Sequence, residues 1–228
     1  VRPLTLVLHS SIDHNGAFHR DPKMTAVFKN SKINALMIEG GETLGEYKSQ
    51  IGPLAKEYGV YGKIDQVMFA GHGGSQIIEM AGSVKEGTDG KLKQVDNPID
   101  LQNDKTEADK LFDEVLKNME ETYDDDFIGP QLPKQQNRRI LFNACLTNSN
   151  AVENALSGDL GKAKKEIADY LKNNASLATY LGERAKSQGR DVKSLGANAS
   201  ITQFDMIENS GELTMKSTVD PKVAASKL

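Results

Sequence analysis

Short apolar runs, separated by polar and glycine-rich segments, dominate the first part of the chain. Four of these runs have the length and the β-branched content of buried strands, and they lie at residues 4–8, 33–38, 64–70 and 139–144. Each run stops at a polar or glycine-rich cluster, or at Cys145 in the last case. The pattern therefore predicts strands that end abruptly at one edge of a sheet.

Apolar residues at helical spacing follow several of these strands. They predict a helix over 44–58, with Gly59 as its C-terminal cap and with a kink or break at Pro53. A second helix is expected over 104–122, where Asp104 is the N-cap and Glu107 its capping-box partner. Strands that alternate with helices indicate an α/β protein with a mostly parallel, sandwiched sheet.

The rest of the chain is less regular. Residues 82–103 are rich in Gly, Asp, Asn and Lys and are expected to form a long loop insertion. Two more helices are expected at 162–173 and at 176–188, the latter beginning at Ser176 and ending at Gly189. Strand-like pieces at 191–207 and 212–217, around a turn at 209–211, predict a small antiparallel addition, with 206–228 as a C-terminal hairpin and tail.

Composition narrows the class of protein. The 228 residues suit one domain, and 28 Lys and Arg against 32 Asp and Glu leave a net charge of -4. That balance provides no global basic surface for nucleic acid, and no apolar run reaches the roughly 18 residues of a membrane span. The single cysteine excludes an internal disulfide.

The ends of the chain bear on its location. The chain starts at Val1 without a preceding signal peptide, which suggests a processed or trimmed chain, and with the lone thiol it favours the cytoplasm. The final Ser-Lys-Leu matches a peroxisomal address, but a match of three residues is better explained by chance.

Two strand ends carry the residues with the most distinctive chemistry. His72 follows the strand 64–70, and Cys145 follows the strand 139–144. Ligands of open parallel sheets bind beyond the carboxyl ends of the strands, so neighbouring strands would bring the two residues together. An imidazole beside a thiol activates the thiol for nucleophilic acyl transfer. The N–H groups of Gly73 and Cys145 are candidates for an oxyanion hole.

Other interpretations use the same residues. A lone cysteine at the end of an apolar strand is most often a buried small hydrophobic residue. The segment Gly71-His72-Gly73-Gly74 is also typical of a phosphate loop, although it lacks the GxGxxG spacing. His9, His14 and His19 could join His72 in a metal site, but their spacing matches no familiar ligand pattern and favours scattered loop histidines, so we expect no metal.

The two strand ends, VMFAGHGG and ILFNAC, together resemble the paired signatures of the caspase-like cysteine peptidases of clan CD. Within that group the block ILFNACLT is most similar to bacterial CHAT-type proteases and the self-cleaving protease domains of large toxins. The resemblance covers residues 1–205 in element order and implies a three-layer α/β/α fold. It also implies a cysteine endopeptidase in which Cys145 is the nucleophile and His72 the general base and acid.

The resemblance further implies a substrate pocket. The residue two before the nucleophile is Asn143, which matches the position that lines this pocket in the family. Asp13 is the candidate for a second wall and for a third catalytic residue, and Arg20 is its rival for the wall. A simple turn or cap residue is the better explanation of Asp13.

Three functions therefore remain open at the level of sequence. The first is a cysteine endopeptidase that acts on a protein or peptide without a cofactor. Self-cleavage within a larger chain is a version of the same chemistry, and either form would allow an activating partner. The second is a non-catalytic caspase-like scaffold or binding module. The third is a flavodoxin-like small-molecule binder that uses the 71–74 turn as an anion nest. The related toxin domains are activated by inositol hexakisphosphate, but the basic residues here are scattered, and we do not expect that activator.

Overall fold

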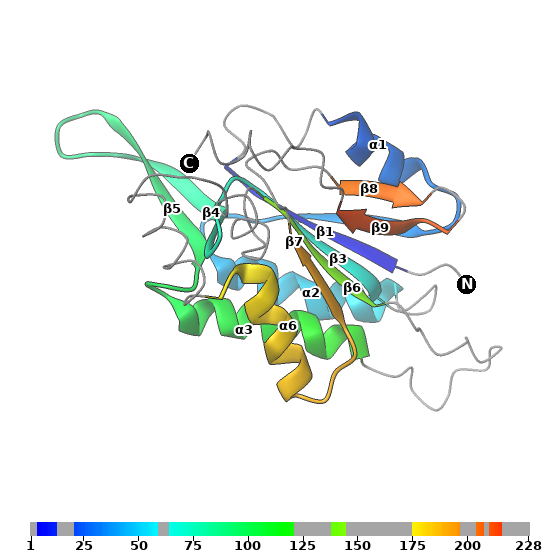
Figure 1. Cartoon of the computed structure of the whole chain (residues 1–228). Coiled ribbons are helices and arrows are strands. Elements are labelled where there is room, and N and C mark those ends of the chain that lie inside the picture. Colours follow the sequence, from blue (N-terminus) through cyan, green and yellow to red (C-terminus); the bar gives the residue numbers. More distant parts are fainter. Residues whose placement is uncertain are drawn as a thin grey trace, which may run out of the picture.

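The computed structural model describes residues 4–12, 21–58, 64–120, 138–144, 175–196, 204–207 and 210–215. Its centre is a five-stranded sheet (Figure 1). In spatial order the strands are β2 (Asn34–Glu39), β1 (Leu4–His9), β3 (Ile64–Ala70), β6 (Arg139–Asn143) and β7 (Lys193–Gly196). Every neighbouring pair in this sheet is parallel, so all the carboxyl ends meet at one edge. The predicted α/β class with a mostly parallel sheet is confirmed.

Helices and a small hairpin cover the two faces of the sheet (Figure 1). One face carries α2 (Leu44–Tyr58), α3 (Lys105–Glu120) and α6 (Leu177–Ser187). The other face carries α1 (Pro22–Lys29) and the antiparallel pair β8 (Phe204–Ile207) and β9 (Glu212–Met215). The arrangement is a three-layer sandwich, as the sequence predicts, and it includes the predicted antiparallel C-terminal addition.

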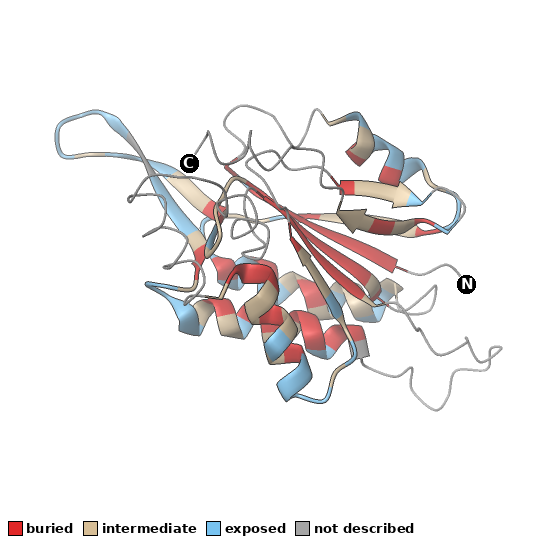
Figure 2. Cartoon of the chain, in the orientation of Figure 1, coloured by how far each residue is buried: buried red, intermediate tan, exposed pale blue. Residues whose placement is uncertain are grey.

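Alternation along the central strands separates two cores. On β1, Leu4, Leu6 and Leu8 join the larger core beneath α2, α3 and α6, whereas Val7 joins the smaller core beneath α1 and the hairpin. Successive side chains of a strand point to opposite faces, so a strand covered on both faces has no polar side. This explains the continuous apolar runs in the sequence, and Figure 2 shows the central strands as the most thoroughly buried part of the protein.

The segment expected as a long loop is instead a β-hairpin. Residues 77–100 form the antiparallel pair β4 (Ile77–Glu86) and β5 (Leu92–Asp100), which projects from one end of the molecule (Figure 1). Gly90 lies in the connecting turn at φ 72°, a backbone conformation that glycine adopts without steric cost. The outer half of the hairpin is exposed, with Val84 at 64% and Leu92 at 75% (Figure 2). Because neither face of that half is buried, the sequence lacks the alternation that identifies a strand.

The sequence analysis did not predict helix α1, although Asp21 and Pro22 form a standard start signal: Asp21 Oδ1 accepts the Lys23 N–H at 2.8 Å. The helix predicted over 44–58 is confirmed as α2, and it continues through Pro53 without a break. Tyr47 and Ile51 in this helix are fully buried, and that tertiary packing outweighs the loss of one backbone hydrogen bond.

The predicted helix ends are mostly confirmed. Asp104 caps α3 by accepting the Glu107 N–H at 3.3 Å, although the reciprocal bond of a capping box is replaced by a bond from the Asp104 N–H to Asp100. Ser176 caps α6, and Gly189 follows that helix at φ 72°. Gly59 and the helix expected at 162–173 lie outside the described residues. Within the described ranges, no helix is both long and apolar enough to cross a bilayer.

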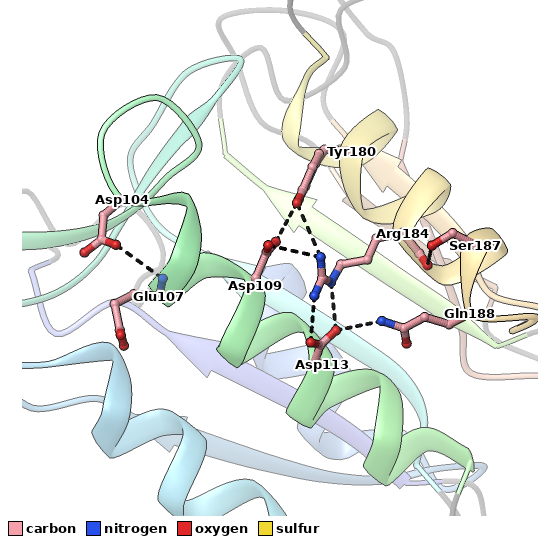
Figure 3. A network of polar contacts seen from close by, with 8 residues as sticks. All are labelled: Asp104, Glu107, Asp109, Asp113, Tyr180, Arg184, Ser187 and Gln188. Atoms are coloured by element: carbon pink, nitrogen blue, oxygen red, sulfur yellow. Dashed lines mark hydrogen bonds and ion pairs between the residues drawn. The ribbon is translucent and has the colours of Figure 1, made fainter.

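A polar network joins the outer surfaces of α3 and α6 (Figure 3). The Arg184 guanidinium donates two hydrogen bonds of 2.7 Å to the Asp113 carboxylate and lies 3.1 Å from Asp109. The Tyr180 hydroxyl donates to Asp109 at 2.5 Å, and Gln188 donates to Asp113 at 2.8 Å. The hydrogen bond from Arg184, assisted by that from Gln188, lowers the pKa of Asp113.

We predict that Arg184→Met weakens the attachment of α6 at neutral pH, by about 1 kcal/mol because the pair is partly exposed to solvent. A carboxylate whose pKa is lowered by folding contributes stability above its unfolded pKa and loses it as the pH falls through the folded value. The stability difference between wild type and variant should therefore shrink below about pH 4. Urea unfolding at pH 7 and pH 3 measures both quantities.

The control is Lys110→Met, which removes an exposed ion pair between Lys110 and Glu107 within α3. Its effect at pH 7 should be the smaller of the two. Equal losses in the two variants would show that the bidentate pair adds nothing specific to the α3–α6 contact.

Candidate functional site at the carboxyl edge of the sheet

The pairing of β3 with β6 positions the candidate site. The two strands are neighbours, which is the condition under which the sequence analysis brings His72 and Cys145 together, and their ladder ends at the pair Ala70 and Asn143. One further bond, from the Gly71 N–H to the Asn143 carbonyl at 3.4 Å, continues the contact past the end of β3. The segments that leave the two strands therefore start side by side at one edge of the sheet.

Stacked aromatic rings hold this pair of strands together. The rings of Phe69 on β3 and Phe142 on β6 stack at 5.1 Å between centroids with an interplanar angle of 11°. Phe112 of α3 meets both rings edge-on, at 5.8 and 6.0 Å. Offset stacking and edge-to-face contact are the favoured geometries for aromatic pairs, and a three-ring cluster restricts sliding between the strands.

The predicted site residues divide into those that the structure places and those outside it. His72 follows Ala70 by two residues, and Cys145 would follow Asn143 by two residues as well. Cys145 is joined directly to Ala144, the last described residue of this segment, but it lies outside the described residues itself, as does Asp13. His72, Gly73 and Asn143 are all placed at the carboxyl edge.

Asn143 is the predicted substrate-pocket residue, and it is almost completely buried, with 2% of its surface exposed. Its Oδ1 atom has no hydrogen-bond partner among the described residues, and the same holds for Ser75 Oγ in the turn after β3. Nearly all buried polar atoms in folded proteins are paired, so unpaired ones commonly mark functional sites. This edge therefore holds polar groups that the described part of the fold leaves unused.

The glycines of the turn after β3 have a structural role that sequence reasoning missed. The turn folds back on β4, where Gly73 forms an isolated antiparallel bridge with Ile78. A Cβ atom on Gly71 would lie 2.2 Å from the Glu79 carbonyl oxygen, and one on Gly73 would lie 2.4 Å from that of Ile77. Both positions need glycine because the β4 backbone approaches too closely for any side chain.

The bridge also determines which way the backbone of the turn points. Glu79 donates its N–H to the His72 carbonyl at 2.7 Å, and Gly74 donates its N–H to Ile77 at 2.8 Å. These bonds lie on either side of the Gly73–Ile78 pair, so Gly73 occupies a non-hydrogen-bonded position and its N–H points away from β4.

The start of α6 and the segment between β5 and α3 also bond to the turn and its continuation. The Leu177 N–H, in the first turn of α6, donates to the Ser75 carbonyl at 2.7 Å, and the Leu101 N–H donates to Gln76 at 3.0 Å. The Gln76 side chain also donates to the Ala175 carbonyl at 3.1 Å. Backbone bonds from three separate segments thus define the position of His72.

His9 is not the loop histidine that its sequence context suggested. It is the last residue of β1 and is fully buried. The Tyr47 hydroxyl of α2 lies 2.5 Å from the His9 carbonyl oxygen and 2.7 Å from the Met80 carbonyl oxygen on β4. The hydroxyl proton is therefore shared between these two acceptors. Burial raises the pKa of Tyr47 well above its usual range, and the hydroxyl remains a donor at physiological pH. His14 and His19 lie outside the described residues.

Asp100, the last residue of β5, is a second buried polar group at this end of the molecule. It accepts the N–H groups of Gln102 and Asn103 at 2.8 and 3.0 Å, and the Asn103 side-chain amide at 2.7 Å. Burial alone would raise the pKa of Asp100, but these hydrogen bonds together lower it. Asp100 is therefore a structural carboxylate that closes the junction between β5 and α3.

The close approach of β4 makes a specific prediction for the glycines. Gly73→Ala should cost about 1–3 kcal/mol of stability, since the new methyl group meets backbone atoms that no rotamer change can move. The matched control is Gly74→Ala, whose Cβ would lie 3.7 Å from the Ile77 side chain in ordinary contact. It should change the unfolding free energy by less than about 0.5 kcal/mol. Urea unfolding of the two variants measures the difference, and equal values would contradict the assigned bridge.

Comparison with known proteins adds no family to this description. No family model matches the chain. A search of the solved structures likewise finds no match to this fold.

Proposed function

We propose that this protein is a cysteine endopeptidase in which Cys145 is the nucleophile and His72 the general base and acid. One observation carries the proposal: the neighbouring parallel strands β3 and β6 end at the register pair Ala70 and Asn143, and in the sequence His72 and Cys145 each come two residues after that pair. Neighbouring strands are about 4.8 Å apart, and residues two apart on a strand share a face. Because His72 and Cys145 are equally far from the same register pair, their side chains are expected to be adjacent.

The proposed reaction uses only groups of the chain and water. His72 takes the proton of the Cys145 thiol, and the sulfur attacks the carbonyl carbon of the peptide bond. The Gly73 N–H, which points away from β4, and the Cys145 N–H would donate to the oxyanion. The imidazolium then protonates the amine as the C–N bond breaks, leaving a thioester. Water, deprotonated by His72, hydrolyses the thioester and restores the thiol.

Asn143 would contribute to recognition of the substrate side chain before the cut. Its buried Oδ1 lacks a donor among the described residues, so a donor on the substrate would gain a hydrogen bond there and relieve an unpaired group. A site built in this way discriminates against side chains without a donor. We therefore propose a polar, hydrogen-bonding preference at this position, in place of the charged preference that Asp13 or Arg20 would give.

The backbone geometry favours this proposal over an anion nest. A nest needs successive N–H groups that point into one concavity. In this turn the Gly71 N–H donates toward β6 and the Gly74 N–H donates toward β4, so both are consumed within the protein and point in different directions. A scaffold without catalysis would leave the buried polar atoms of Ser75 and Asn143 without a purpose.

The test of the proposal compares three proteins on fluorescently labelled casein. Cys145→Ala should reduce cleavage to background, and His72→Ala should reduce it by about 10²–10⁴-fold, because each removes a group that acts in the transition state. New peptide termini are identified by mass spectrometry, and circular dichroism confirms that the variants are folded. Cleavage at the same sites by Cys145→Ala would exclude the proposed nucleophile.

A second prediction needs no substrate. Since Cys145 is the only cysteine, alkylation by iodoacetamide reports on this thiol alone. A thiol paired with an imidazole should react with an apparent pKa well below the ordinary value of about 8.5, and His72→Ala should return it to about that value. Identical pH profiles in both proteins would show that the two residues do not interact.

A further inference from the structure

The turn after β3 is rich in glycine and is attached to the rest of the fold at its tip. Three of the four residues 71–74 are glycines, and β4 lies too close to two of them for any side chain. Glycine has more backbone freedom than any other residue, so such a turn needs outside restraints to hold one conformation. The Gly74 N–H bond to the Ile77 carbonyl closes the turn, which leaves Ser75 and Gln76 as its tip.

Backbone bonds hold this tip from two directions. The Ser75 carbonyl accepts the Leu177 N–H, in the first turn of α6, at 2.7 Å. The Gln76 carbonyl accepts the Leu101 N–H, between β5 and α3, at 3.0 Å. Both bonds use main-chain acceptors, so they do not depend on which side chain occupies either position of the tip.

The Gln76 side chain adds one donated and one accepted bond, as a primary amide can. Its Nε2 atom donates to the Ala175 carbonyl at 3.1 Å, and its Oε1 atom accepts the Gln102 Nε2 at 2.6 Å. Ala175 precedes the N-cap Ser176, so its carbonyl lies outside the hydrogen-bond ladder of α6. The donor from Gln76 gives that carbonyl a partner and attaches the tip of the turn to the start of α6.

The short ladder of the turn carries this attachment back to His72. The two sides of the turn are joined by the bridge between Gly73 and Ile78, and by the Glu79 N–H, which donates to the His72 carbonyl at 2.7 Å. A shift at the tip therefore moves the backbone of His72. Displacement of a catalytic group by about 1 Å can lower a rate by about 10²-fold.

We propose that Gln76 is a positioning residue of the site: by donating to the Ala175 carbonyl, it fixes the turn against α6 and holds His72 in place for its reaction with the Cys145 thiol. This inference rests on the proposed peptidase function. Gln76 acts through the backbone of the turn, and it takes no part in proton transfer or in the attack on the peptide bond.

The first test compares kcat and KM for cleavage of labelled casein by two matched variants. Gln76→Met removes the bond to Ala175 and the bond from Gln102, whereas Gln102→Met removes the latter and keeps the former. Gln76→Met should lower kcat by about 5–50-fold with little change in KM, because the groups that bind substrate are unchanged. Gln102→Met should leave kcat within about twofold of the wild-type value.

Three kinetic results would contradict the proposal. An unchanged kcat in Gln76→Met would show that the side chain does not position the site. Equal losses in Gln76→Met and Gln102→Met would assign the effect to the bond between the two glutamines instead of the bond to Ala175. A raised KM with an unchanged kcat would assign Gln76 to substrate binding.

Hydrogen exchange tests the same contact without any activity. In a Cys145→Ala background, Gln76→Met should speed exchange of the Gly74 and Glu79 amides by about tenfold or more, because both amides bond across the turn. The Lys193 amide at the start of β7 is the reference, and its rate should not change. Unchanged exchange in the turn would overturn the proposal, and equally faster exchange at all three amides would show general destabilisation instead.

The two experiments separate this proposal from the peptidase assignment. Cleavage by Cys145→Ala at the wild-type rate would exclude the proposed function, whereas faster exchange confined to the turn would still show that Gln76 fixes it. A confirmed nucleophile together with turn amides that do not respond to Gln76→Met would support the peptidase and exclude Gln76 as its positioning residue.

Discussion

The pairing of β3 with β6 is the constraint on which the rest of the protein depends. The stacked rings of Phe69 and Phe142, closed by Phe112, fix the register of this ladder on the side of the large core. Side chains alternate with a period of two, so a slip of one residue would exchange the faces of β6. Phe142 would leave the core, and Asn143 would leave the edge where the turn after β3 begins. Aromatic packing within the sheet therefore determines the alignment of groups beyond it.

The other end of the same ladder holds the C-terminal hairpin. The first register pair of the β3–β6 ladder is Gln66 and Arg139. Both residues are buried and polar, and both bond to Leu213 on β9. Gln66 Oε1 accepts the Leu213 N–H at 2.5 Å, and Arg139 donates to the Leu213 carbonyl at 3.0 Å. Arg139 also pairs with Glu212. Burial raises the pKa of Asp65, and Arg138 and Arg139 offset that effect in part. One ladder thus anchors β9 at its start and the candidate site at its finish.

The sequence was informative where structure depends on local chemistry or on full burial. The strands 64–70 and 139–144 and the cap at Asp104 were predictable, because continuous apolar runs and capping residues carry their own signals. The β4–β5 hairpin was not, since its exposed half buries neither face. The break expected at Pro53 is absent, because the packing of α2 against the core outweighs the unfavourable effect of proline inside a helix. The role of Gly71 and Gly73 could not be found from the sequence, since it depends on an isolated bridge to β4.

The glycines beside His72 show how one motif acquires a different meaning once the fold is known. In the sequence they suggest room for a substrate to approach the backbone. In the structure that room at Gly71 and Gly73 is filled by β4, which could not otherwise approach the turn so closely. Only a turn without side chains at these two positions allows the β4 backbone to come close enough for the Glu79 N–H to bond to the His72 carbonyl. The glycines therefore serve the site by fixing the backbone of the turn that carries His72.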